Sequence, residues 1–334
     1  MDYKISIIGA GSWGSALARI VSDNGYQVLI YDINEDTVNE INTYHTNKSK
    51  LPNGTLNENV KATSNLKEAV AFGDIILLVV PTKVIRSVLE EVNKVITSKK
   101  IFVNASKGIE PQTFKRVSEI TYEVIDNQYI ESFVALTGPS HAEEVILQLL
   151  TVVAAASTNM EHAKLIQKIF SNQQYFRVYA LDDLIGAELG GSLKNIIALA
   201  SGIIDGLGYG DNAKAALVTR GLVEMSKLAV ALGAKEQTLF GLTGLGDLVV
   251  TCFSEHSRNF QAGRKIAQGK DLNKTLSEMS MVVEGARSCE AAYVASKKYN
   301  VETPIIDAVY DIIYKQNHPQ DVIKRLMKRS LKVE

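Results

Sequence analysis

Cysteine is scarce in this chain of 334 residues, which contains only Cys252 and Cys289. Two cysteines without a pattern of spacing are too few for a disulfide framework or for a metal cluster. We therefore expect two buried free thiols, no bound metal and a reducing compartment.

An excess of charge is also lacking, because 36 lysines and arginines are balanced by 37 aspartates and glutamates. Such a chain has no general attraction for nucleic acid or for an anionic membrane surface, so any anion site has to be local. The longest apolar stretch, 145–156, is interrupted by Gln148 and Thr151. It is shorter than the roughly 20 residues of a membrane span. A strand pattern begins at Lys4 and leaves no room for a signal peptide, so we expect a cytoplasmic protein without a membrane span.

Short runs rich in β-branched residues alternate with helical patterns through the first half of the chain. These runs lie at 4–8, 27–31, 74–80, 101–104, 133–136, 151–156 and 175–178. The alternation predicts an α/β fold with a doubly wound, mainly parallel sheet. From about residue 182 onward the β-type runs stop, and periodic segments predict helices at 184–207, 213–232 and 305–314. We expect the α/β domain at 1–186 and an all-helical domain at 187–334, without a flexible linker.

A glycine-rich turn directly follows the first predicted strand. Gly9, Gly11 and Gly14 have the spacing GxGxxG, and the sequence after them predicts a helix at 15–22. Glycines at this spacing give a tight turn, let backbone N–H groups approach a pyrophosphate, and bring the helix N-terminus close to the sheet. The first domain is therefore predicted to be a Rossmann domain that binds a dinucleotide. A glycine turn without a ligand is the alternative.

An acid ends the second predicted strand. Asp32 lies close to the roughly 20-residue offset at which a carboxylate accepts hydrogen bonds from the adenosine ribose. A carboxylate there repels a 2′-phosphate, and Ile33 follows it in place of an arginine or lysine that would bind one. The pattern favours NAD(H) over NADP(H). The alternative is that Asp32 is a helix N-cap or a turn residue.

Further candidate residues follow later strands, at the sheet edge where ligands of doubly wound folds bind. Lys107, flanked by Ser106 and Gly108, is a candidate for an anion site, although a loop lysine is usually solvated. The turn at 138–142 precedes a helical pattern, and its N–H groups are a second candidate. His141 within that turn fits a surface or capping position better.

In the helical domain, Lys194 and Asn195 lie in an otherwise apolar, small-residue helix, where a charged residue has no obvious packing purpose. We expect the lysine to face a cleft. A partly buried lysine can give and take a proton near neutral pH, which carbonyl reduction requires. The alternative is a lysine that extends to the surface and pairs with Glu188 or another acid.

Two later segments complete the set of candidates. Arg258 offers a planar fork of donors and Asn259 an amide, a pair well suited to holding a phosphate dianion. Asp247 lies in the glycine-rich segment 241–248 and could position Lys194 or accept a bond from a substrate hydroxyl. A helix cap explains Asp247 almost as well.

Long motifs throughout the chain resemble bacterial NAD(P)-dependent glycerol-3-phosphate dehydrogenases over essentially the whole length. They are GAGSWGSALA at 9–18, SKGIE at 106–110, GPSHAEEV at 138–145, ELGGSLKNIIALASGI at 188–203, GYGDNAKAALVTRG at 208–221, GLTGLGDLVVTC at 241–252, HSRN at 256–259 and VVEG at 282–285. The resemblance implies a helical second domain like that of 6-phosphogluconate dehydrogenase. It also implies reversible hydride transfer between a nicotinamide and C2 of dihydroxyacetone phosphate, giving sn-glycerol 3-phosphate for phospholipid synthesis.

The same resemblance implies roles for individual residues. Lys194 matches the proton donor and acceptor, with Lys107 as a second cation near the carbonyl oxygen. Matches to substrate-binding positions are Lys107, Gly138, Ser140, Lys194, Asp247, Ser257, Arg258 and Asn259. Matches to cofactor-contacting positions, beside the glycine turn and Asp32, are Ser12, Trp13, Lys107, Ala142, Arg258, Val282 and Glu284.

The chain departs from many relatives in having Tyr31-Asp32-Ile33 where they have Trp-Gly followed by a basic residue, which favours NAD(H) and puts use of NADP(H) in doubt. The nearest rival functions are the 3-hydroxyacid and 6-phosphogluconate dehydrogenases, which lack the HSRN segment in this arrangement. A non-catalytic sensor of the dinucleotide is a rival of another class, and it would need none of Lys107, Lys194 and Arg258. A homodimer is expected from the family.

Overall fold

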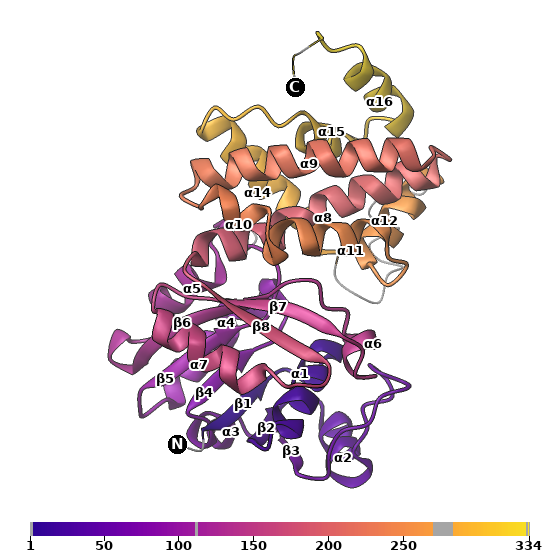
Figure 1. The fold of residues 1–334 in the computed structure, drawn as a ribbon. Helices are drawn as coiled ribbons and strands as arrows, with labels where there is room; N and C mark the ends of the chain where they lie inside the picture. Colours follow the sequence, from indigo (N-terminus) through magenta and orange to yellow (C-terminus); the bar gives the residue numbers. More distant parts are fainter. Residues whose placement is uncertain (1–2, 111–112, 270–282, 332, 334) are drawn as a thin grey trace. The chain divides into compact units, whose positions relative to one another are not determined.

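The computed structural model describes residues 3–110, 113–269, 283–331 and 333 of the chain (Figure 1). The chain divides into two compact units, Met1–Glu188 and Leu189–Glu334. The border between them falls inside α8 (Leu184–Gly206).

The N-terminal unit is built on one eight-stranded sheet with the order β3-β2-β1-β4-β5-β6-β7-β8. Its strands are β1 (Lys4–Ile8), β2 (Gln27–Tyr31), β3 (Val60–Thr63), β4 (Ile75–Leu78), β5 (Lys100–Asn104), β6 (Ile130–Thr137), β7 (Thr151–Ala156) and β8 (Phe176–Leu181). Neighbouring strands are parallel except β6 and β7, which pair antiparallel.

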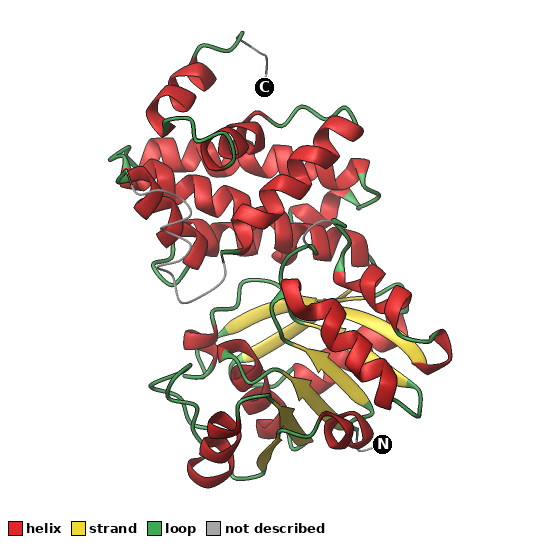
Figure 2. Ribbon diagram, turned by 180° about the vertical axis from the view of Figure 1, so that it is seen from behind, coloured by secondary structure: helices red, strands yellow, loops and turns green. Residues whose placement is uncertain are grey.

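Helices cover both faces of this sheet (Figure 2). One face packs against α1 (Ser12–Asp23), α2 (Glu35–Tyr44), α6 (Ala142–Val145) and α7 (Met160–Phe170). The other packs against α3 (Leu66–Phe72), α4 (Thr82–Val95) and α5 (Val117–Val124), and a short 3₁₀ turn, η1 (Asn127–Tyr129), precedes β6. Successive residues of β4 enter opposite cores, Ile75 and Leu77 one and Ile76 and Leu78 the other. Burial on both faces explains why this strand is continuously apolar.

The predicted α/β class with a doubly wound, mainly parallel sheet is confirmed, and each predicted strand is present with ends within three residues of those expected. The edge strand β3 was not predicted, because its sequence Val-Lys-Ala-Thr is short and half polar. The antiparallel entry of β7 follows from the connection before it. The 13 residues between β6 and β7 contain only the four-residue α6, whereas the connection between two parallel strands usually contains a full helix.

The C-terminal unit is helical throughout its described residues, as predicted. After α8 it contains α9 (Asp211–Ala231), α10 (Glu236–Leu239), the π-helical turn η2 (Leu242–Gly246), α11 (Asp247–Phe253), α12 (Arg258–Ala267), α14 (Glu284–Lys298), α15 (Pro304–Ile313) and α16 (Pro319–Met327). The helices predicted at 184–207, 213–232 and 305–314 are α8, α9 and α15. None of the described helices combines the length and the apolar character needed to cross a membrane.

Glycines let α8 and α12 touch through their backbones. A Cβ atom on Gly202 would lie 2.0 Å from the carbonyl oxygen of Phe260, and one on Gly263 would lie 2.2 Å from that of Leu199. Both distances are far below any real contact, so a side chain at either position would force the helices apart. The close crossing fixes how the polar residues of α8 and α12 face each other.

A buried carboxylate holds the start of α15. Glu224 on α9 accepts hydrogen bonds from the backbone N–H of Ile305 at 2.8 Å and of Ile306 at 3.2 Å. These N–H groups have no partner within their own helix, and the positive end of the helix attracts the carboxylate. Burial disfavours the charged carboxylate more than these hydrogen bonds favour it, and it raises the pKa of Glu224 from 4.5 to about 7.

This raised pKa predicts a pH dependence of stability. The folded chain holds the Glu224 proton more tightly than the unfolded chain, so the stabilising contribution is complete below pH 4.5 and is lost as the pH rises to about 7. The loss is of the order of 3 kcal/mol. We expect Glu224→Gln, which cannot ionise, to lack this component when urea midpoints are compared from pH 4.5 to 7.5. The exposed Glu236→Gln is the control, and equal pH profiles for wild type and Glu224→Gln would contradict the prediction.

Candidate active site

The glycine-rich turn joins β1 to α1 in the N-terminal unit. Gly9 has a φ of +114°, and a Cβ atom there would lie 2.7 Å from the carbonyl oxygen of Val79. A Cβ atom on Gly14 would lie 2.0 Å from the carbonyl oxygen of Gly9. The space beside Gly11 is open, because nothing lies within 4 Å of a Cβ placed there. Two glycines thus fold the turn, and the third leaves room for a ligand at the N-terminus of α1.

Asp32 closes the same turn from the end of β2. Its Oδ2 accepts from the backbone N–H of Ala10 at 2.8 Å, and its Oδ1 accepts from that of Asn34 at 2.9 Å. The N-cap of α2 is Asn34 and not Asp32. The capping alternative is therefore wrong for Asp32, while the turn contact with Asn34 is real. Each carboxylate oxygen has a second acceptor position that could take a ribose hydroxyl.

Residues after β5 and β6 lie together at the carboxyl edge of the sheet. Lys107 donates from Nζ to the carbonyl oxygen of Gly138 at 2.9 Å, and Ser140 donates from Oγ to the same oxygen at 2.9 Å. Lys107 is thus tied to the edge and is not merely a solvated loop lysine. Ala142 begins α6, and His141 is its N-cap residue, in keeping with the expected capping position.

Two polar atoms near this edge are buried without a hydrogen-bond partner among the described residues. They are Nε1 of Trp13, in the glycine-rich turn, and Oγ1 of Thr137, the last residue of β6. Buried polar groups are normally satisfied, so orphans of this kind point to a missing partner. Together with the open space at Gly11, they fit a bound dinucleotide.

In the C-terminal unit, Lys194 lies at the centre of a buried polar cluster. Only 4% of Lys194 and 1% of Asp247 are exposed. Lys194 Nζ lies 2.6 Å from Asp247 Oδ1 and 2.6 Å from Thr251 Oγ1. The hydroxyl of Thr251 in turn donates to the carbonyl oxygen of Asp247 at 2.5 Å. Asp247 therefore positions Lys194, one of the two roles anticipated for it, and Gly246 rather than Asp247 precedes α11 as its N-cap.

Glu188 contacts residues at the start of α5. It accepts from the backbone N–H of Ser118 at 2.9 Å and forms an ion pair with Arg116 at 3.2 Å. The part of the alternative in which Lys194 extends to the surface is wrong, because only 4% of Lys194 is exposed. The pairing with another acid, which the alternative also allowed, is present, and that acid is Asp247.

Thr251 is the member of this cluster that sequence reasoning missed. It lies four residues after Asp247 on α11, a spacing that puts both side chains on one face of the helix. That spacing was the available signal, but a threonine at such a spacing is too common to stand out. Cys252 follows it, and burial raises the pKa of its thiol to about 12. Both cysteines are buried and free, as expected.

Asn195, beside Lys194, belongs to a second chain of contacts. Asn259 on α12 donates from Nδ2 to Asn195 Oδ1 at 3.0 Å and accepts at Oδ1 from the backbone N–H of Gly285 at 2.8 Å. A Cβ atom on Gly285 would lie 2.4 Å from the carbonyl oxygen of Asn195. These contacts join α8, α12 and the first turn of α14, where Glu284 is the first residue. Val282 lies outside the described residues.

The N-terminus of α12 carries the remaining candidates. Ser257 is the N-cap, and its Oγ accepts from the backbone N–H of Phe260 at 3.2 Å. Arg258 is the first residue of the helix, is exposed, and forms no ion pair within the part of the chain that the structure describes. A guanidinium without a carboxylate partner, at the positive end of a helix, suits an anionic group.

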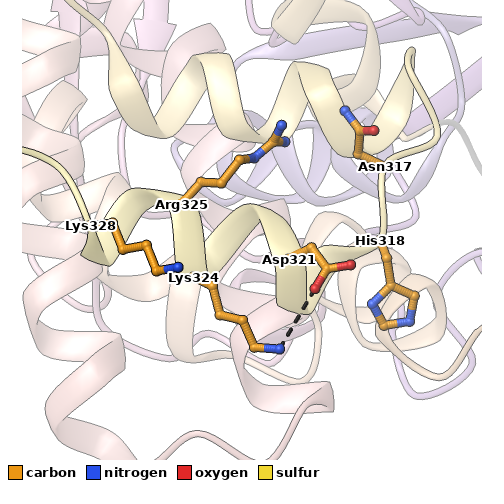
Figure 3. A pocket seen from close by; sticks show the side chains of 6 residues that line it. All are labelled: Asn317, His318, Asp321, Lys324, Arg325 and Lys328. Atoms are coloured by element: carbon orange, nitrogen blue, oxygen red, sulfur yellow. Dashed lines mark ion pairs between the residues drawn. The ribbon is translucent and has the colours of Figure 1, made fainter.

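A pocket of about 300 Å³ on α16 is unrelated to these residues (Figure 3). It is lined by Asn317, His318, Asp321, Lys324, Arg325 and Lys328. Two of its cations already have partners, since Lys324 pairs with Asp321 at 3.7 Å and Arg325 with Asp311 at 3.1 Å. None of the residues predicted for the site lines this pocket.

Comparison with known proteins agrees with the residue chemistry. The model of the NAD-dependent glycerol-3-phosphate dehydrogenase N-terminus matches residues 4–163, and that of the C-terminus of the same family matches residues 183–324. The glycerol-3-phosphate dehydrogenase (NAD(P)+) of Macrococcus caseolyticus is 49% identical over 98% of both chains. That of Staphylococcus aureus is 50% identical over 99% of both chains.

A solved structure is similar over the same extent. The crystal structure of glycerol-3-phosphate dehydrogenase from Coxiella burnetii superposes with a TM-score of 0.91 at 35% identity, covering 98% of this chain and 99% of that one. The chain therefore belongs to the NAD-dependent glycerol-3-phosphate dehydrogenase family.

Proposed function

We propose that this protein reversibly reduces dihydroxyacetone phosphate to sn-glycerol 3-phosphate, the backbone precursor of phospholipids. In this proposal residues 1–186 bind the dinucleotide and residues 187–334 bind the substrate and supply the acid. The observation that carries the proposal is the buried Lys194 ammonium held by Asp247 and Thr251. The hydroxyacid dehydrogenases and a non-catalytic sensor are not favoured, because the full-length relatives are named for the glycerol-3-phosphate reaction.

The substrate phosphate is assigned to the start of α12. Arg258 supplies an exposed guanidinium there. Asn259 carries two N–H donors on Nδ2, and Asn195 accounts for one of them. Ser257 caps the helix and fixes the turn from which Arg258 extends. Holding the phosphate in one orientation fixes the carbonyl carbon for reaction and removes much of the entropic barrier.

Lys194 is assigned as the general acid. When bound, the nicotinamide cofactor supplies the hydride that reduces C2. Lys194 Nζ donates a proton to the carbonyl oxygen as negative charge develops there, keeps the N–H electron pair, and becomes a neutral amine. In the reverse direction this amine takes the proton from the hydroxyl of the alcohol. Asp247 and Thr251 hold Nζ in one direction through both states. We assign Lys107, Gly138 and Ser140 to the substrate as well, with Lys107 as a second cation for the oxygen.

The first prediction concerns Lys194. We expect Lys194→Ala to lower kcat by about 10² to 10⁴, the usual cost of removing a general acid. The single substitution leaves the buried Asp247 carboxylate without its cation, which destabilises a fold strongly. The double variant Lys194→Ala/Asp247→Asn removes both charges and is the control for folding, followed by circular dichroism and by NADH binding. Wild-type turnover in either folded variant would refute the assignment.

For the cofactor, we propose a preference for NAD(H), with NADP(H) as a slower alternative. Asp32 supports this preference, since it presents a carboxylate at the end of β2, and the neighbouring Ile33 is 83% exposed and carries no charge for a 2′-phosphate. The other assigned cofactor residues are Gly9, Gly11, Ser12, Trp13, Gly14, Lys107, Ala142, Arg258, Val282 and Glu284.

A substitution at Asp32 tests this preference. Asp32→Ser removes the negative charge, and the shorter serine side chain no longer reaches the ribose hydroxyls. Loss of a hydrogen bond to a charged group costs about 1.5 to 3 kcal/mol. We therefore expect kcat/KM for NADH to fall by about 10- to 100-fold, and the NADPH-to-NADH ratio of kcat/KM to rise. Parallel assays of dihydroxyacetone-phosphate-dependent cofactor oxidation measure both values. A wild-type enzyme that is faster with NADPH would contradict the preference.

We further propose a cytoplasmic homodimer. Two buried free cysteines suit a reducing compartment. In the C-terminal unit, Phe240 is 52% exposed and Phe253 is 47% exposed. A second copy would cover aromatic residues of this kind. Sedimentation equilibrium at micromolar concentration is the measurement, and a monomer there would contradict the proposal.

A further inference from the structure

A strap of residues 45–56, between α2 and β3, lies against the glycine-rich turn. Asn47 on this strap is only 2% exposed. Its Nδ2 donates to the carbonyl oxygen of Ala10 at 2.7 Å and to Ser15 Oγ at 3.0 Å. Ser12 Oγ donates back to the carbonyl oxygen of Lys50 at 3.0 Å. The strap and the turn are therefore joined by side-chain bonds in both directions.

The strap keeps its shape through contacts that do not involve the side chain of Asn47. The backbone N–H of Leu56 donates to the carbonyl oxygen of His45 at 2.7 Å, and that of Leu51 donates to the carbonyl oxygen of Asn47 at 2.8 Å. Leu51 and Leu56 are buried in the core beneath α1. Glu40 on α2 accepts from the backbone N–H of Lys48 at 2.7 Å. Asn47 is thus presented by a frame that is anchored on its own.

Asp32 and Asn47 form hydrogen bonds with the two backbone polar groups of Ala10. Its N–H donates to Asp32, and its carbonyl oxygen accepts from Asn47. A peptide bond is planar and trans, so the N–H of Gly11 points away from the carbonyl of Ala10. Asn47 therefore sets the direction of the Gly11 N–H, at the residue beside which the space is open. Through Ser15 it also holds the first turn of α1.

We infer that Asn47 is a positioning residue for the dinucleotide, holding the Ala10–Gly11 peptide so that the N–H groups at the start of α1 face the pyrophosphate. The inference rests on the proposed function, because it assumes that the turn binds the cofactor. Without Asn47, this peptide can rotate, and the donors must be ordered again each time cofactor binds. The expected effect is on cofactor affinity and not on the chemical step.

The chain offers a matched control at the other end of the same helix. Asn24, the C-cap of α1, also uses Nδ2 twice, donating to the carbonyl oxygens of Ile169 at 2.8 Å and Ser171 at 3.2 Å. Asn47→Ala and Asn24→Ala each remove two hydrogen bonds that a side-chain amide donates to hold α1 in place. Only Asn47 contacts the glycine-rich turn. A general loss of stability therefore affects both variants, whereas loss of positioning affects one.

The test is direct titration of the full chain with NADH, followed by cofactor fluorescence, together with steady-state kinetics. We expect Asn47→Ala to raise both the Kd and the KM for NADH about tenfold, with kcat at saturating NADH within about twofold of wild type. Asn24→Ala should leave the Kd within about twofold. Asn47→Ser, which keeps a single donor and is the milder change if Asn47→Ala does not fold, should give an intermediate Kd.

Three outcomes would overturn the inference. One is equal weakening by Asn47→Ala and Asn24→Ala, which would indicate a structural effect only. Another is an unchanged Kd in folded Asn47→Ala and Asn47→Ser. The third is a wild-type chain that does not bind NADH at all, which would overturn the proposed function first and this inference with it.

Discussion

The ammonium of Lys194 lies among buried side chains, and a charge in that position persists only where a carboxylate and further hydrogen bonds replace the lost water. Asp247 and Thr251 replace that water from α11, so α11 has to lie close to α8. A glycine on α8 lets η2, which leads into α11, come this close. A Cβ atom on Gly190, one turn before Lys194, would lie 2.5 Å from the carbonyl oxygen of Thr243 in η2. The short Asp247 side chain reaches Nζ only because the backbones meet at this distance.

The two asparagines extend the same constraint to the rest of the unit. Asn259 binds Asn195 on one side and the N–H of Gly285 on the other. The residue assigned to the substrate phosphate is therefore hydrogen-bonded to the neighbour of Lys194, the proposed general acid, and to the start of α14, where Glu284 is assigned to the cofactor. A displacement of α8, α12 or the start of α14 would break hydrogen bonds to the other two segments. Asn195 and Asn259 are buried, so water cannot replace the lost partners.

Much of the fold and part of the site could be predicted from sequence because their signals are local. The apolar strands and the spacing of Gly9, Gly11 and Gly14 are continuous in sequence, and so is the apolar helix that carries Lys194. β3 has no such signal, since Val60–Thr63 pairs only at the sheet edge and is half polar. Lys194 is 53 residues away in sequence from its partner Asp247, and Asn47 is 37 residues away from its partner Ala10. Pairings of that kind depend on how helices and turns pack, which no periodicity records.

Cys252 stands directly after Thr251, and its burial has a chemical consequence. Oxidants and alkylating agents react with the thiolate and not with the thiol. Cys252 is fully buried, and burial raises the pKa of its thiol to about 12, so the side chain is almost entirely the thiol at neutral pH. A sulfenic acid or an adduct at this position would insert polar bulk into the helix that orients the ammonium. Burial thus leaves a nucleophilic atom beside the residues that hold the Lys194 ammonium and lowers its reactivity toward electrophiles.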